Sequence, residues 1–169
     1  MKLNKVQLRQ EVFSSDALKI INWLEDDEIT RYLNEGQNVC NSIKQVMNRV
    51  NMPILTHLFN QNGSFFILTT KQEEPIGFLR LVPKGKNAEI VIVIGDKKKW
   101  GLGLGSNAIF QGLKEAFFKW RVDEVIAKIN FRNERSIRVF KKVGFRAEKQ
   151  LAKETQFSMT MDDFLKIAA

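Results

Sequence analysis

Three glycines at alternate positions mark the segment of this sequence whose residue types most clearly suggest a binding site. Gly101, Gly103 and Gly105 follow three lysines at 97–99 and an apolar run at 90–94. Glycine lets backbone N–H groups approach an anion closely, and the N-terminus of a following helix adds a favourable electrostatic field. Lysines just upstream add long-range attraction for phosphate. The segment therefore predicts a cradle for a pyrophosphate group, although the same glycine spacing also suits a flexible turn.

Two familiar nucleotide-binding motifs do not describe this loop. A dinucleotide-binding unit needs Gly-x-Gly-x-x-Gly early in a repeated strand–helix series. Here the glycines follow the spacing Gly-x-Gly-x-Gly, and antiparallel strands are expected before them. A P-loop needs Gly-Lys-Ser or Gly-Lys-Thr, which the sequence lacks. The loop is therefore either a phosphate site of another kind or a flexible turn.

The composition excludes several classes of protein. The chain has 169 residues, 44% of them hydrophobic and 27% charged, so we expect a single domain over 1–169 that buries its own core. The single cysteine, Cys40, cannot form an internal disulfide, which fits a reducing cytoplasm. One cysteine and one histidine leave little for metal binding. No apolar run is long enough to cross a bilayer, and no export signal is expected at the N-terminus. We therefore expect a cytoplasmic protein without a metal.

The net charge of +8 gives information about the binding partners of the protein but not about its fold. Nucleic acid, an acidic protein surface or a polyanionic cofactor would each satisfy it. An aromatic and basic recognition motif is lacking, so nucleic acid is not the favoured partner. The acidic run at 25–28 could attract a cationic amine, but acidic residues also begin helices for purely local reasons.

The spacing of apolar residues predicts the elements that position the loop. Strands are expected over 5–13, 64–70, 76–82, 89–94, 125–129 and in two segments around 153–154. Helices are expected over 17–24, with cap chemistry at 14–16, and over 27–33, 43–50, 109–120 and 133–142. Turn signals separate the three strands between 64 and 94, which predicts an antiparallel meander. The order of elements predicts an α+β fold with a mixed sheet.

Three segments resemble the GNAT superfamily of acetyl-CoA-dependent N-acetyltransferases. The loop at 100–105 resembles the pyrophosphate loop of that family. Its Trp100 stands where most members have glutamine or arginine, which is similar to the branch of ribosomal-protein-alanine and spermidine acetyltransferases. The segment 130–145 resembles the family's Asn-x-x-Ser/Ala … Lys-x-Gly-Phe motif, and 16–33 resembles the N-terminal helices of that branch. The three matches occur in the family's order and span nearly the whole chain.

The resemblance implies a fold and a co-substrate. The sheet would be curved, mostly antiparallel and splayed open near its middle, with helices on both faces. Acetyl-CoA would lie with its pantetheine arm in the splay and its pyrophosphate on the loop. The residues that the resemblance assigns to this binding are Ile92, Val93, Ile94, Lys99, Trp100, Gly101, Leu102, Gly103, Leu104, Gly105, Ser106, Asn133 and Phe140. A further basic cluster between 132 and 146 would face either the 3′-phosphate or solvent.

The implied reaction is direct attack of a primary amine on the thioester within a ternary complex. An alkyl amine has a pKa of about 10, so it must lose a proton first. Glu89 is the candidate base, directly or through water, with an exposed strand-end glutamate as the alternative. A backbone N–H near Val93 or Ile94 would polarise the carbonyl. Many relatives protonate the leaving thiolate with a tyrosine where this chain has Phe140, so here Ser136 or water would do so, or the step proceeds without an acid.

Several alternatives stay open at this point. Asn133 is expected to cap a helix as well as to contact the cofactor, and Tyr32 either lines the acceptor pocket or lies at the core edge. Phe140 motivates a second function, a non-catalytic acyl-CoA-binding or sensing module, and the charge alone motivates an RNA-associated protein. The acceptor is a protein N-terminus or a small amine. A polyamine is less attractive unless the acidic run forms the pocket. The protein would be a monomer or a homodimer.

Overall fold

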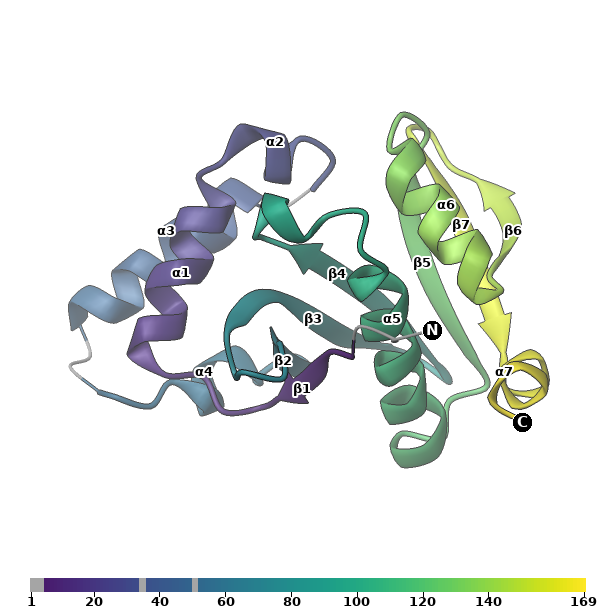
Figure 1. The fold of residues 1–169 in the computed structure, drawn as a ribbon, viewed down its shortest axis with the longest axis horizontal. Coiled ribbons are helices and arrows are strands. Elements are labelled where there is room, and N and C mark those ends of the chain that lie inside the picture. The colour runs from purple at the N-terminus through teal and green to yellow at the C-terminus, as the bar shows by residue number, and fades with distance from the viewer. Residues whose placement is uncertain (1–4, 34–35, 50–51) are drawn as a thin grey trace.

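Seven strands form one sheet with helices on both of its faces (Figure 1). The computed structural model describes residues 5–33, 36–49 and 52–169. The strand order is β1-β2-β3-β4-β5-β7-β6. The strands are β1 (Gln7–Arg9), β2 (Ser64–Thr69), β3 (Pro75–Lys84), β4 (Asn87–Ile94), β5 (Glu124–Asn130), β6 (Arg146–Gln150) and β7 (Glu154–Thr160). The helices are α1 (Ser14–Leu24), α2 (Asp27–Thr30), α3 (Gly36–Arg49), α4 (Thr56–Phe59), α5 (Leu104–Lys114), α6 (Glu134–Val143) and α7 (Met161–Ala168). A 3₁₀ turn, η1 (Lys97–Lys99), precedes α5, and a π-helical turn, η2 (Glu115–Lys119), follows it.

The central strands bury side chains on both faces, which explains their nearly continuous apolar sequence. In β2, Phe66 and Leu68 pack into the cluster formed with α5, α6 and α7. Phe65 and Ile67 point the other way, into the cluster formed with α1 and α3. The sheet is thus covered by the N-terminal helices on one face and by the C-terminal helices on the other, as expected.

The sheet opens between its two halves. Strands β3 and β4 pair in antiparallel register from Gly77↔Ile94 to Lys84↔Asn87. Strands β4 and β5, the parallel neighbours, pair only at Ala88↔Val125 and Glu89↔Ile126. Beyond Glu89 the two strands diverge, and Figure 1 shows the widening interval between them. The expected splayed, mostly antiparallel α+β sheet is confirmed.

The first strand and first helix differ from the expected boundaries. The predicted strand over 5–13 is ordered as a strand only at Gln7–Arg9. The reason is Asp16, whose carboxylate accepts from the backbone N–H of Phe13 at 2.8 Å and pairs with Arg9 at 2.8 Å. Phe13 occupies the N-cap position without a side-chain hydrogen bond, and the capping contact comes from Asp16 in the first turn, within the segment predicted to supply it.

Later boundaries shift for local reasons as well. The helix expected over 27–33 ends at Thr30. Helix α3 ends at Arg49, and Val50, which the sequence placed in it, lies outside the described residues, as does the side chain of Cys40. Helix α7 was not predicted, although Thr160 accepts from the backbone N–H of Asp163 at 3.2 Å as an N-cap. In the described part of the chain, every helix is too short or too polar to cross a bilayer.

Candidate functional site

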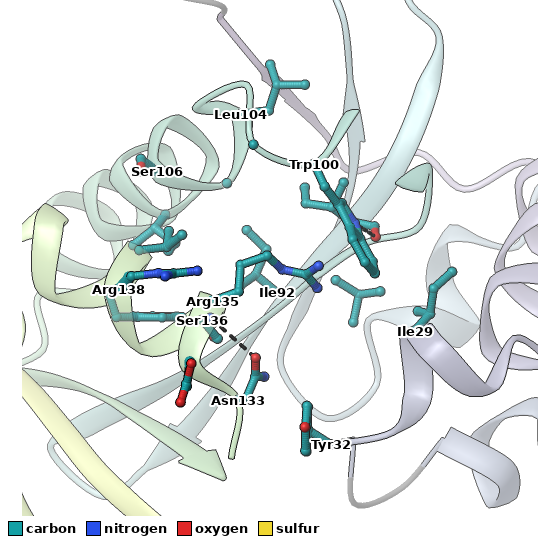
Figure 2. Close-up of a pocket in the computed structure, with 18 of the residues that line it drawn as sticks. Ile29, Tyr32, Ile92, Trp100, Leu104, Ser106, Asn133, Arg135, Ser136 and Arg138 are labelled. Atoms are coloured by element: carbon teal, nitrogen blue, oxygen red, sulfur yellow. Dashed lines mark hydrogen bonds between the residues drawn. The ribbon is translucent and has the colours of Figure 1, made fainter. Parts of the chain in front are cut away.

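A pocket of about 470 Å³ opens where β4 parts from β5. It lies between the glycine loop, the segment around α2 and the N-terminal half of α6 (Figure 2). Most of the residues selected from the sequence line it: Tyr32, Ile92, Val93, Ile94, Lys99, Trp100, Gly101, Gly103, Leu104, Gly105, Ser106, Asn133, Ser136 and Phe140. Segments more than 100 residues apart in the sequence therefore meet at one place.

Two predicted residues are not among those that line the pocket. Leu102 lies between two lining glycines, and its side chain is half exposed. Glu89 lies on β4 at the last residue pair shared with β5, before the strands part. Its carboxylate is 3.6 Å from Lys128 Nζ and 3.9 Å from Lys84 Nζ. The structure thus holds Glu89 in an ion-pair cluster at the base of the splay, and its role as a base stays a prediction.

The glycine loop has the backbone that an anion cradle needs. Gly101 and Gly103 both have φ of +78°, a conformation that favours glycine. Gly103 is the N-cap of α5, so the first N–H groups of this helix lack partners within it. A Cβ atom built on Gly101 or Gly103 would meet nothing within 4 Å, which leaves open space above both residues. The loop therefore presents the N-terminus of α5 to a ligand from that space.

Trp100 and Arg135 connect the two sides of the pocket. The indole N–H of Trp100 donates to the carbonyl oxygen of Ile94 at 2.9 Å, which fixes the ring beside the end of β4. The guanidinium carbon of Arg135 lies 3.3 Å from the centre of the Trp100 ring. Figure 2 shows Arg135 projecting from α6 toward that ring. Partial desolvation lowers the pKa of Arg135, and the charge of Glu28 opposes this effect. The contact is a cation–π stack across the mouth of the splay.

Helix α6 and its N-cap residue present three of the predicted residues to the pocket. Asn133 accepts from the backbone N–H of Ser136 at 3.3 Å, which confirms its role as a helix cap. Phe140, one turn after Ser136, is buried and contacts Phe145 edge to face at 5.0 Å. Since residues four apart share a face of a helix, Ser136 and Phe140 line the same wall.

Replacing Asn133 with alanine is expected to lower the free energy of unfolding by about 1 kcal/mol, because the N-cap hydrogen bond is lost. Asn133→Ser retains a capping hydroxyl and is expected to retain the stability. Urea denaturation of both variants measures the effect. An Asn133→Ala protein as stable as the parent would contradict the capping role. An equal loss of acetyl-CoA affinity in both variants would instead report a contact of the amide with the cofactor.

A second group of lining residues lies outside the predicted site, although the sequence places three of them, Arg132, Arg135 and Arg138, in the basic cluster expected to face the 3′-phosphate or solvent. They are mostly charged side chains without a recognisable motif: Glu28, Arg31, Arg132, Glu134, Arg135 and Arg138. Among the basic ones, Arg135 and Arg138 lie on α6 and Arg132 just before it, and their spacing alone favours a solvated face. Among the described residues, no group of three or more His, Cys, Asp or Glu side chains is placed to hold a metal ion.

Comparisons with known proteins agree with this geometry. The family described as an acetyltransferase (GNAT) domain matches residues 6–146. An N-acetyltransferase 9-like protein of Nematostella vectensis is 32% identical over 84 residues, which are 48% of this chain and 42% of that protein. The match thus spans less than half the length of this curated relative.

Solved structures share the fold over nearly the whole chain. A spermidine N-acetyltransferase of Vibrio cholerae, in complex with CoA and spermine, has a TM-score of 0.79 at 17% identity and covers 95% of this chain and 98% of its own. A GNAT-family acetyltransferase of Bacillus anthracis has a TM-score of 0.72 at 18% identity, over 96% and 98% of the two chains.

Proposed function

This chain belongs to the acetyltransferase (GNAT) family, whose members use acetyl-CoA, and from that premise we propose that it acetylates a primary amine. The acceptor is a protein N-terminus or a small amine, which attacks the thioester directly in a ternary complex. The observation that carries the proposal is the pocket at the splay, where the glycine loop meets the unpaired end of β4. The proposal extends to a cytoplasmic protein that acts as a monomer or a homodimer.

The residues of the splay fit acetyl-CoA. The open space above Gly101 and Gly103 gives a pyrophosphate access to the first amides of α5, and Lys99 adds positive charge beside it. The backbone of β4 from Ile92 to Ile94 lines the pocket and has lost β5 as a partner, so a pantetheine amide can pair with it. When bound, acetyl-CoA supplies an activated acetyl group as a thioester.

The acceptor amine must lose its proton, and Glu89 can accept it only over a distance. Glu89 precedes Ile92 by three residues, which at about 3.3 Å per residue is about 10 Å along the strand. Of the two routes open to Glu89, transfer through water is the one that this position supports. Lys84 and Lys128 lie within ion-pair distance of this carboxylate and hold it at the base of the splay.

Replacing Glu89 with glutamine is expected to lower turnover by up to about 10²-fold, because the proton acceptor is removed. The loss is expected to be largest at low pH, where the smallest fraction of the amine is neutral without help. The affinity for acetyl-CoA is expected to stay nearly unchanged. A pH–rate profile measures the effect, with Glu124→Gln at the start of β5 as the control. If the pH–rate profile of Glu89→Gln overlays that of the parent, the proton leaves the amine by another route.

Departure of the thiolate requires no dedicated acid for the reaction to proceed, since a thiol has a pKa of about 8.5. Ser136 lies one helical turn before Phe140 on the pocket wall and can donate its hydroxyl proton directly or through water. Phe140 itself cannot donate a proton. We therefore assign it to packing against the reacting end of the cofactor.

Phe140 also supports a second candidate function, a non-catalytic module that binds or senses acyl-CoA. Release of free thiol from acetyl-CoA, followed with a panel of amines, separates the two candidates. Transfer requires thiol release that depends on the amine. Tight acetyl-CoA binding without release for any amine of the panel would establish the sensing module and overturn the transferase.

A further inference from the structure

The acidic residues beside α2 are neutralised by lysines of the same chain. Lys97 Nζ lies 2.9 Å from Asp26 Oδ2 and 3.1 Å from Glu28 Oε2. The contact with Asp26 raises the pKa of Lys97 and lowers that of Asp26, so both groups are charged at neutral pH. Glu25 pairs with Lys44 of α3. Three of the four carboxylates of the acidic run, those of Glu25, Asp26 and Glu28, are thus already paired with lysines of the described structure, which weakens their attraction for a cationic acceptor.

The pocket that these residues border is rich in positive charge. Its lining includes five cationic side chains and two carboxylates: Arg31, Lys99, Arg132, Arg135 and Arg138, with Glu28 and Glu134. One of the carboxylates, Glu28, already pairs with Lys97. Positive side chains therefore outnumber the carboxylates of the lining, and a second positive charge on an acceptor would meet net repulsion.

Arg135 is the cation best placed to meet an acceptor. Its guanidinium stacks on Trp100, which holds it at the pocket mouth, and Glu28 of α2 is near enough to act on its charge. Among the residues that the structure describes, no carboxylate forms an ion pair with Arg135. Arginine stays charged and presents a rigid fork of N–H donors that matches a carboxylate or phosphate. The stack therefore preorganises an anion receptor facing the region of α2.

Building on the proposed acetyl transfer, we propose that the acceptor carries a carboxylate or phosphate close to its amino group, and that Arg135 binds this anionic group. Polyamines are then poor acceptors, in contrast to the spermine bound to the Vibrio cholerae relative. The positive lining also lowers the pKa of a bound amine, because nearby like charge disfavours its protonated form. The same cations would thus select the acceptor and prepare it for attack.

Binding of two matched peptides to the CoA-loaded protein tests the inference. The peptides share one sequence except at positions two and three, which are both glutamate or both lysine. We expect the glutamate peptide to bind at least about tenfold more tightly by calorimetry, and the difference to shrink at high salt. Arg135→Gln is expected to reduce the difference to about twofold. Lys141→Gln, which removes a positive charge from an exposed residue of α6 outside the pocket lining, is expected to retain it.

Removal of the ion pairs that Lys97 forms with Asp26 and Glu28 allows a second test, in which spermine binding is measured. Lys97→Gln frees Asp26 and Glu28, so spermine is expected to bind about fivefold more tightly than to the parent. Lys98→Gln removes the same charge from the neighbouring position, which has no ion pair with α2 in the described structure, and is expected to change spermine binding little.

Equal binding of the two peptides would overturn the inference. So would an Arg135→Gln protein that loses affinity for CoA but keeps its preference between peptides, because Arg135 would then serve the cofactor. Release of free thiol from acetyl-CoA in the presence of the same peptides measures acetyl transfer independently of peptide binding. If the glutamate peptide binds selectively but is not acetylated, the acetyl transfer fails while the anion receptor stands.

Discussion

Replacing Gly103 with valine is expected to lower the affinity for acetyl-CoA by about 10- to 100-fold. The φ of +78° at Gly103 opens the first amides of α5 toward the pocket, and a side chain there would project into the space above them. Charged hydrogen bonds of the kind that a pyrophosphate accepts are each worth about 1.5–3 kcal/mol, so loss of one accounts for the effect. Calorimetric titration with acetyl-CoA measures it.

The variant also carries backbone strain, which needs its own control. A β-branched residue at positive φ costs about 1–3 kcal/mol of stability. Gly85 has φ of +62° in the turn between β3 and β4, and a Cβ built there also meets nothing within 4 Å. Gly85→Val should therefore show a similar loss of stability with unchanged affinity. Unchanged affinity in a folded Gly103→Val protein would show that the loop does not hold the pyrophosphate.

Replacing Phe140 with tyrosine is expected to raise turnover if departure of the thiolate limits the rate. Phe140 lines the pocket on the wall it shares with Ser136, so the added hydroxyl can face the leaving sulfur. General-acid assistance is worth about 10²–10⁴-fold when proton transfer is rate-limiting. Steady-state turnover with acetyl-CoA and a reactive amine measures the gain.

Turnover of Ser136→Ala, measured alone and in combination with Phe140→Tyr, tests whether Ser136 donates the proton. If Ser136 donates the proton in the parent, Ser136→Ala lowers turnover, and Phe140→Tyr restores it in the double variant. If water or no acid serves, Ser136→Ala has little effect in either background. A Phe140→Tyr protein with parental turnover and a parental response to Ser136→Ala would contradict limiting thiolate departure.

The sequence predicted well those parts of the site that depend on local chemistry. The glycines at 101 and 103 signal positive φ by residue type, and Asn133 signals a helix cap by its place before an amphipathic helix. The meander and the splay follow from strand order and from the family resemblance. These features depend on residues that are close together in the sequence, so they can be predicted without knowledge of the fold.

Contacts between distant charged residues could not be predicted in this way. Arg135 and Trp100 are separated by 35 positions, and only the fold shows that they stack. Lys97 seemed to serve phosphate attraction, but its ammonium group lies instead against Asp26 and Glu28. A charged side chain is long and takes several directions, so its partner depends on packing that no local pattern records.

The splay gives the sheet four edges instead of two. The outer edges are protected against pairing with a foreign chain: β1 has only three residues, and all five residues of β6 are exposed, with Arg146 and Lys149 among them. The inner edge of β4 lines the pocket from Ile92 to Ile94, and the Arg135–Trp100 stack spans the mouth of that pocket. A foreign strand would have to pass this stack before it could pair with the backbone of β4, which disfavours such pairing. The protein can therefore keep unsatisfied strand backbone in its middle without exposing it to aggregation.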